Sequence, residues 1–165
     1  MKLILKNKFL SPTGKSTIKT EKGVDAYKVK GSFLNPVKTK KLYDLDGNLL
    51  YIVKNKFWTF FYHTAFIYNP DKELVCSVKK HQLSASRKYE CEEFETPLYM
   101  EREFMSLTTT VYKDGKETAT IRRPSFFAIV DTFEIETEDE ENMPLYLALT
   151  LAIDNIGDER RKERN

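Results

Sequence analysis

The sequence has 165 residues, 41% hydrophobic and 32% charged, which is typical of one soluble domain with a substantial core. Its formal net charge of +2 is nearly neutral and argues against a dedicated nucleic-acid binder. Lys6 and Lys8 interrupt the first apolar stretch before a signal peptide could form, so we expect a cytoplasmic protein.

Charge is distributed unevenly between two parts of the chain. Residues 1–62 contain 13 lysines and 4 acidic residues, whereas residues 63–165 contain 14 basic and 21 acidic residues. Such asymmetry indicates either a surface that meets anions or a basic set of strands beside an acidic set.

A short pattern recurs every 24 residues in the first third of the chain. An apolar residue is followed by lysine and, at the fifth position, by phenylalanine in residues 5–9, 29–33 and 53–57. Fainter copies follow at residues 78–80, 100–104 and 121–123. Turn signals keep the same spacing, at residues 21–23, 46–48, 69–71, 95–97 and 113–115. Each unit predicts two strands joined by a tight turn, so the repeat predicts about twelve antiparallel strands.

The repeat stops at the acidic residues 136–141, and a helix is predicted after it. The helix is expected to begin near Pro144 and to end at Gly157, since proline favours the first turn and glycine the position after the last. From residue 145 to 153 only Thr150 is polar, so every face of this helix should be buried. At about 13 residues it is too short for a bilayer, which takes roughly 20.

A closed sheet of about twelve strands leaves a lumen that one helix of about 10 Å diameter can fill. The sequence therefore predicts a mainly β fold, an antiparallel closed β-barrel of about twelve strands with a central buried hydrophobic C-terminal α-helix. Residues 1–157 form this single domain, and residues 158–165 are expected to be a disordered charged tail. With the lumen occupied, ligands are expected on the outside of the strands, on the loops or at the rims.

The chain also resembles a known family. The repeated Lys-x-Lys-Phe units, the hairpin of residues 42–49, the strand of residues 131–135 and the helix end at residues 151–154 resemble the LURP-one-related family. That family is grouped with the tubby C-terminal domain and the phospholipid scramblases, and the resemblance covers residues 1–156. It implies a twelve-stranded barrel around a hydrophobic helix. Most bacterial members have no assigned role, and no tubby phosphoinositide pocket can be matched to residues of this chain.

Nothing in the sequence favours catalysis or metal binding. His63 and His81 are far apart and form no HExxH or Cys-His arrangement. Cys76 and Cys91 form no CxxC pair and are expected to pack in the core. Asp154, near the end of the apolar helix, is expected to emerge at the barrel mouth or to accept hydrogen bonds from loop amides. We therefore expect a non-enzymatic protein without a cofactor or metal.

Lysines at equivalent repeat positions are the candidates for binding an anionic ligand: Lys6, Lys8, Lys30, Lys54, Lys56, Lys79 and Lys80. With Leu5, Val53 and Phe57 pointing inward, strict alternation places Lys6, Lys54 and Lys56 on the outside. Outward lysines can serve solubility alone or can hold a lipid headgroup at the surface. The aromatic run of residues 57–62 suits a membrane interface.

The function expected from these features is that of a binding or scaffold module. The first hypothesis is association with anionic phospholipid surfaces, as a cytoplasmic protein peripheral to the membrane. The alternative is a protein–protein interaction module that uses the acidic segment of residues 134–142 or an exposed strand edge.

Overall fold

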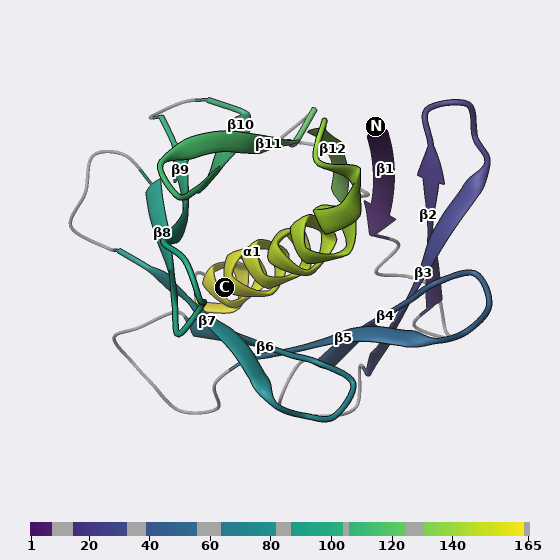
Figure 1. Ribbon diagram of the computed structural model, residues 1–165, viewed down its shortest axis with the longest axis horizontal. Helices are drawn as coiled ribbons and strands as arrows, with labels where there is room; N and C mark the ends of the chain where they lie inside the picture. The colour runs from purple at the N-terminus through teal and green to yellow at the C-terminus, as the bar shows by residue number, and fades with distance from the viewer. Residues whose placement is uncertain are drawn as a thin grey trace.

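The computed structural model describes residues 1–7, 15–32, 39–55, 64–81, 87–103, 106–124 and 131–163 (Figure 1). It contains twelve strands: β1 (Lys2–Asn7), β2 (Lys15–Thr20), β3 (Asp25–Ser32), β4 (Thr39–Tyr43), β5 (Leu49–Asn55), β6 (Thr64–Tyr68), β7 (Leu74–Lys80), β8 (Arg87–Glu92), β9 (Leu98–Arg102), β10 (Thr108–Lys113), β11 (Lys116–Arg122) and β12 (Asp131–Thr137). A 3-10 turn, η1 (Glu140–Asn142), leads into one helix, α1 (Met143–Glu163).

The strands form one closed antiparallel barrel. Each strand pairs with its neighbours in sequence, and β1 closes the sheet by pairing with β12, with Leu3 opposite Ile135 and Leu5 opposite Phe133. The barrel and its twelve strands confirm the fold predicted from the 24-residue repeat.

The repeat places one equivalent residue on each odd-numbered strand. These residues are all buried: Leu5, Val29, Val53, Val78, Met100 and Ile121. Because successive side chains of a strand alternate between faces, the lysine after the apolar residue points outward on the first strands. Each 24-residue unit of the repeat therefore forms one pair of strands with an apolar inner face.

Tight turns connect the strand pairs at the places where turn signals occur. Gly47 and Gly115 adopt φ angles of +95° and +72°, which side chains with a Cβ rarely adopt. In the turn between β4 and β5 the Asp44 carboxylate accepts hydrogen bonds from the backbone N–H and the side-chain amide of Asn48, both at 2.7 Å. The predicted hairpin at residues 42–49 is confirmed.

Helix α1 runs through the lumen, as Figure 1 shows. Residues 145–152 are buried without interruption, and the hydroxyl of Thr150 donates a hydrogen bond to the Tyr146 carbonyl at 2.8 Å. The helix packs mainly against β5 and β6, and less against β4, β7 and β12. A buried central helix is therefore confirmed, with its principal contacts on one wall of the barrel.

The end of α1 differs from the prediction. The helix continues through Gly157 to Glu163, whereas the sequence predicted that it ends at Gly157. Glycine inside a helix costs only about 1 kcal/mol relative to alanine, and the residues that follow are mostly Glu, Arg and Lys, which are strong helix formers. The stop signal was too weak to end the helix.

Candidate functional site

The structure separates the candidate lysines into different environments. Lys6 and Lys30 are exposed on the outer face, and Lys54 is half-buried there. Lys79 also points outward, but on β7 and paired with Glu92. Lys80 differs from the others, because it lies on the inner face with only 5% of its surface exposed. The remaining candidates, at positions 8 and 56, and the aromatic run of residues 57–62 lie outside the described residues.

The register of the sheet brings further lysines beside the outward candidates. Lys15 on β2 lies directly opposite Lys30 on β3, and Lys30 lies directly opposite Lys41 on β4. Three ammonium groups therefore follow one another across adjacent strands, an arrangement that destabilises a sheet through like-charge repulsion. We give the name basic strand surface to six outward lysines of β1–β5 that have no ion pair to a described carboxylate: Lys6, Lys15, Lys28, Lys30, Lys41 and Lys54. Lys2 and Lys19 lie on the same outer side but are paired with carboxylates of Glu21, Glu134 and Asp25.

Neighbouring tyrosine rings hold two of these ammonium groups. The Nζ of Lys30 lies 4.5 Å from the centre of the Tyr43 ring, and the Nζ of Lys54 lies 5.4 Å from the centre of the Tyr68 ring. A ring face attracts a cation without neutralising its charge. The basic strand surface thus keeps its positive charge while its lysines are ordered.

On the outer face of the opposite wall, several basic side chains form ion pairs. The Nζ of Lys88 lies 3.2 Å from a carboxylate oxygen of Glu90, and Arg122 lies 3.8 Å from one of Glu134. Within the described ranges, no ion pair joins a lysine of the basic strand surface to a carboxylate. The excess of lysine in the first part of the sequence is therefore concentrated on one wall.

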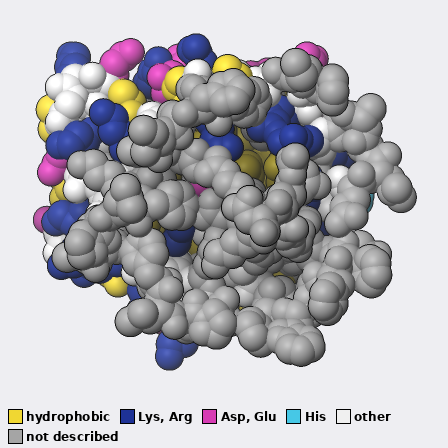
Figure 2. All heavy atoms as spheres, turned by 180° about the vertical axis from the view of Figure 1, so that it is seen from behind, with side chains coloured by type: hydrophobic (Ala, Val, Ile, Leu, Met, Phe, Trp, Pro, Cys, Tyr) yellow, Lys and Arg dark blue, Asp and Glu magenta, His cyan; other side chains and the backbone are white. Residues whose placement is uncertain are grey.

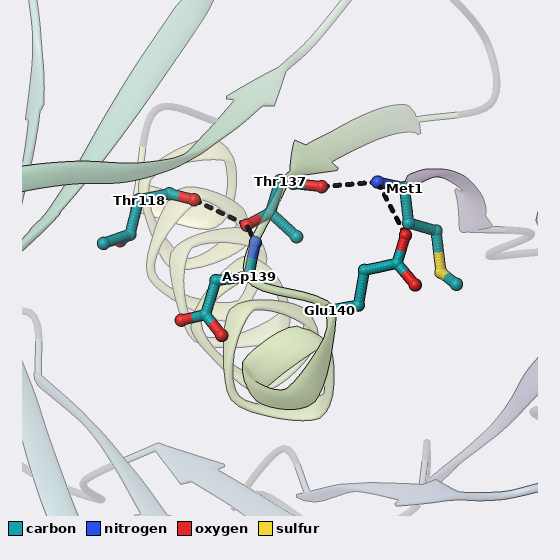
Figure 3. Close-up of polar contacts among 5 residues, drawn as sticks. All are labelled: Met1, Thr118, Thr137, Asp139 and Glu140. Carbon is teal, nitrogen blue, oxygen red and sulfur yellow. Dashed lines mark hydrogen bonds and ion pairs between the residues drawn. The ribbon is translucent and has the colours of Figure 1, made fainter.

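The acidic segment between β12 and α1 is occupied with local contacts (Figure 3). The amino group of Met1 lies 3.3 Å from a carboxylate oxygen of Glu140 and donates a hydrogen bond to the Thr137 carbonyl at 2.5 Å. The Thr137 hydroxyl donates to the Thr118 carbonyl and accepts from the Asp139 N–H at 3.0 Å. These bonds fasten the start of the helix to β1 and β11.

The Asp139 carboxylate also joins the segment to the helix. It accepts a hydrogen bond of 2.7 Å from the hydroxyl of Tyr146, and this bond holds the pKa of Asp139 below its usual value. Burial raises the pKa of Tyr146 to about 12. The strand edge that the sequence left open as a docking surface is absent, because every described strand is paired on both sides.

The inner face carries polar residues at one end of the barrel, which we call the mouth. Four polar residues lie here, each two positions after a buried residue of the repeat: Asn55, Lys80, Arg102 and Arg123. Alternation puts each of them on the same inner face as the apolar residue.

Asp154 of α1 lies among the polar residues of the mouth. Its side chain is 1% exposed and forms an ion pair with the Nζ of Lys40 on β4. Asp154 therefore lies at the mouth, as expected, but its carboxylate is buried there against the Lys40 side chain and does not emerge into solvent.

A cavity of about 50 Å³ opens beside α1 at the mouth, between the helix and the wall of β8–β12. Arg87, Arg102 and Arg123 line it together with Asp154 and several apolar side chains. The sequence placed all ligand sites outside a filled lumen, whereas this cavity lies just inside the rim. Arg102 and Arg123 each lie two residues after a buried repeat position, so alternation indicates their inner face, whereas Arg87 carries no such signal in the sequence.

The cysteines, possible metal ligands and helices of the described residues were also compared with the expectations from the sequence. Cys76 and Cys91 are buried in the core as expected, and a hydrogen bond between the two thiols, together with burial, raises the pKa of Cys91. The described residues contain no cluster of three or more His, Cys, Asp or Glu side chains suited to a metal ion. No helix among them combines the length and the apolarity needed to cross a membrane.

Comparison with known proteins gave one match. A family model described as LURP-one-related matches residues 1–154, which is nearly the whole chain. Searches among curated proteins and among solved structures found no match.

Proposed function

The chain belongs to the LURP-one-related family, and because that membership defines no activity, we propose from its surface that it is a non-enzymatic binding module for anionic phospholipid surfaces. The observation that carries the proposal is the row Lys15–Lys30–Lys41 on neighbouring strands. Such a row costs stability in the isolated protein. Anionic headgroups would remove that cost by neutralising the lysines.

The magnitude of the attraction suits reversible association. Each lysine held near an anionic membrane contributes about 1 kcal/mol, and the six lysines of the basic strand surface lie on one wall. Tyr43 and Tyr68 lie beside these lysines, and tyrosine favours the level of the headgroups. The interaction is electrostatic, so it should weaken with salt.

Co-sedimentation with vesicles tests the proposal. We expect binding at low salt to phosphatidylcholine vesicles that contain phosphatidylglycerol, and none to vesicles of phosphatidylcholine alone. The variant Lys15→Gln, Lys30→Gln, Lys41→Gln should lose most of this binding. A matched variant on the other wall, Lys79→Gln, Lys88→Gln, Lys116→Gln, removes the same charge and should retain it. Absence of charge-dependent binding, or equal losses in the two variants, would contradict the proposal.

A protein partner on the acidic segment of residues 134–142 has less support. Glu134 lies within ion-pair distance of Lys2 and Arg122, and Glu140 lies beside the Met1 amino group. Asp139 is bonded to Tyr146. Since these acids already serve contacts within the chain, fewer are left for a partner. Recovery of a stoichiometric protein from lysate, lost on charge reversal at Glu136 and Glu138, would favour this alternative.

A further inference from the structure

We propose that the mouth cavity is a second anion site, separate from the basic strand surface, that binds a phosphate monoester with an apolar substituent. The proposal does not depend on vesicle binding by the outer lysines. It stands on Arg87 of β8, Arg102 of β9 and Arg123 just after β11, on the charge of the cavity and on its apolar side.

Two of the arginines face each other across neighbouring strands. Arg87 on β8 is the direct register partner of Arg102 on β9, and both line the cavity. Arg102 is only 9% exposed, so its charge lies in a medium of low dielectric constant. No ion pair or hydrogen bond to another described residue neutralises Arg87 or Arg102. Arg87 is exposed at the rim, so a buried guanidinium of Arg102 lies beside a like charge that is open to solvent, and an anion at this position would neutralise both.

The third arginine belongs to the same wall, two strands further on. The guanidinium of Arg123, which follows β11, lies 5.2 Å from the centre of the Phe133 ring of β12. This contact orders the side chain at the cavity wall. Three planar guanidinium groups thus line one small space, and such groups bind phosphate oxygens in pairs of parallel hydrogen bonds.

The charge of the cavity favours a dianion. Asp154 supplies the one carboxylate among the described lining residues, and its charge is shared with Lys40. Among the described lining residues, three arginines thus outnumber one carboxylate, which is paired with Lys40. A phosphate monoester carries close to two negative charges near neutral pH, whereas a carboxylate carries one.

Most of the remaining lining is apolar, and the cavity is large enough to hold a phosphate group. Leu107, Ile121 and Phe133 form a nonpolar side next to the arginines. The cavity volume of about 50 Å³ is several times the roughly 10–15 Å³ that one water needs by the same measure. A phosphate group can lie at the arginines while a short apolar substituent covers the nonpolar side. Figure 2 shows this end of the molecule, with basic and hydrophobic side chains visible between atoms outside the described ranges.

Hexyl phosphate is the probe that tests the proposal. Calorimetric titration of the full chain should show binding of hexyl phosphate, with weaker binding of inorganic phosphate and of hexanoate. The variant Arg102→Met should bind hexyl phosphate roughly 10-fold to 100-fold more weakly, the usual effect of losing a charged hydrogen-bonding partner. Arg122→Met is the matched control, because Arg122 precedes Arg123 but points outward with 57% of its side chain exposed. That control should bind as the wild type does.

Two further measurements test whether Arg102→Met still folds and whether the ligand is a lipid or a soluble ester. Without probe, Arg102→Met should unfold at a temperature at or above that of the wild type, because a buried unneutralised charge has been removed; Arg102→Lys provides a variant that keeps the charge and loses the paired bonds. Vesicles containing phosphatidic acid, which also ends in a phosphate monoester, show whether the site takes a lipid or only a soluble ester.

The outcomes separate this proposal from the proposed function. The outer triple variant should keep its affinity for hexyl phosphate, and Arg102→Met should keep its binding to phosphatidylglycerol vesicles. No binding of hexyl phosphate to the wild type would overturn the proposal, and so would equal affinity in the wild type and Arg102→Met.

Discussion

Lys40 of β4 and Asp154 of α1 form an ion pair inside the barrel across 114 residues of sequence. A helix that is apolar on every face could rotate or slide in an apolar lumen at little cost. One carboxylate that must meet one ammonium group removes that freedom, because any other position would leave a charge buried without its partner. The pair therefore sets the position of the helix relative to β4.

Breaking the pair from one side should be severe. Asp154→Asn leaves the Lys40 ammonium group without its carboxylate, and such losses cost about 3–5 kcal/mol in buried pairs. Urea unfolding followed by circular dichroism measures the change. Lys40→Met, Asp154→Leu should recover most of the loss, because neither charge is then buried alone. A double variant as unstable as Asp154→Asn would show that packing at position 154, and not charge pairing, dominates.

Removal of the Tyr146 hydroxyl should change both stability and titration. Tyr146→Phe breaks the bond to Asp139 and is expected to cost about 1 kcal/mol at neutral pH. The pKa of Asp139 should then rise toward its ordinary value, which a carboxyl chemical shift in an NMR titration reports. An unchanged Asp139 pKa would mean that its other hydrogen bonds, from Asn142, are sufficient.

Tyr146 should also make the protein sensitive to high pH. Its pKa is about 12 in the folded protein and 10.0 in an ordinary tyrosine, so the folded state favours the protonated phenol. The stabilisation is therefore complete below pH 10 and is lost as the pH rises from about 10 toward 12. The free energy of unfolding should fall less steeply over this range in Tyr146→Phe than in the wild type. Parallel curves would exclude Tyr146 as the source.

Truncation of the helix core should create a cavity that the barrel cannot close. Leu147 is fully buried, and Leu147→Ala should destabilise the protein by about 2–5 kcal/mol. Leu74→Ala removes the same atoms from an exposed position on β7 and should cost less than about 0.5 kcal/mol. Thermal unfolding of both variants gives the comparison, and similar losses would argue against a packed lumen.

The turn at Gly47 offers a test of backbone strain alone. A Cβ at this position would meet no atom within 4 Å, so only the φ angle of +95° opposes a side chain. Gly47→Ala should therefore cost about 1–2 kcal/mol. Asp46→Ala, at the neighbouring exposed position, should change the free energy of unfolding by less than about 0.5 kcal/mol. A neutral Gly47→Ala would show that the hairpin relaxes to another turn.

Much of the fold could be predicted because strand periodicity and turn chemistry are local properties. Val29 and Val53, a repeat apart, point inward for the same reason, and Gly47 marks its turn through its own backbone preference. The end of the helix could not be predicted in this way. At Gly157 a weak local stop competes with strong helix formers on its C-terminal side, and the sequence alone did not show which prevails.

The candidate sites depend on register, which is a property of pairs of strands. Lys15 meets Lys30 only because a bulge between Ile18 and Lys19 shifts the pairing of β2 with β3. Sequence spacing does not reveal such a shift. Arg102, by contrast, could have been placed inside from its own strand, since it lies two residues after Met100; its partner Arg87 required the register.

The pairing of β1 with β12 determines when the molecule can become complete. During synthesis β1 leaves the ribosome early, but its partner strand exists only after residues 131–137 have emerged, and the helix that fills the lumen follows later still. Until then the nascent sheet has an open edge and an uncovered apolar face, both of which invite association with other chains. Barrel closure therefore requires residues 131–137, and coverage of the inner face requires the helix that follows them, so neither can occur while these residues are missing.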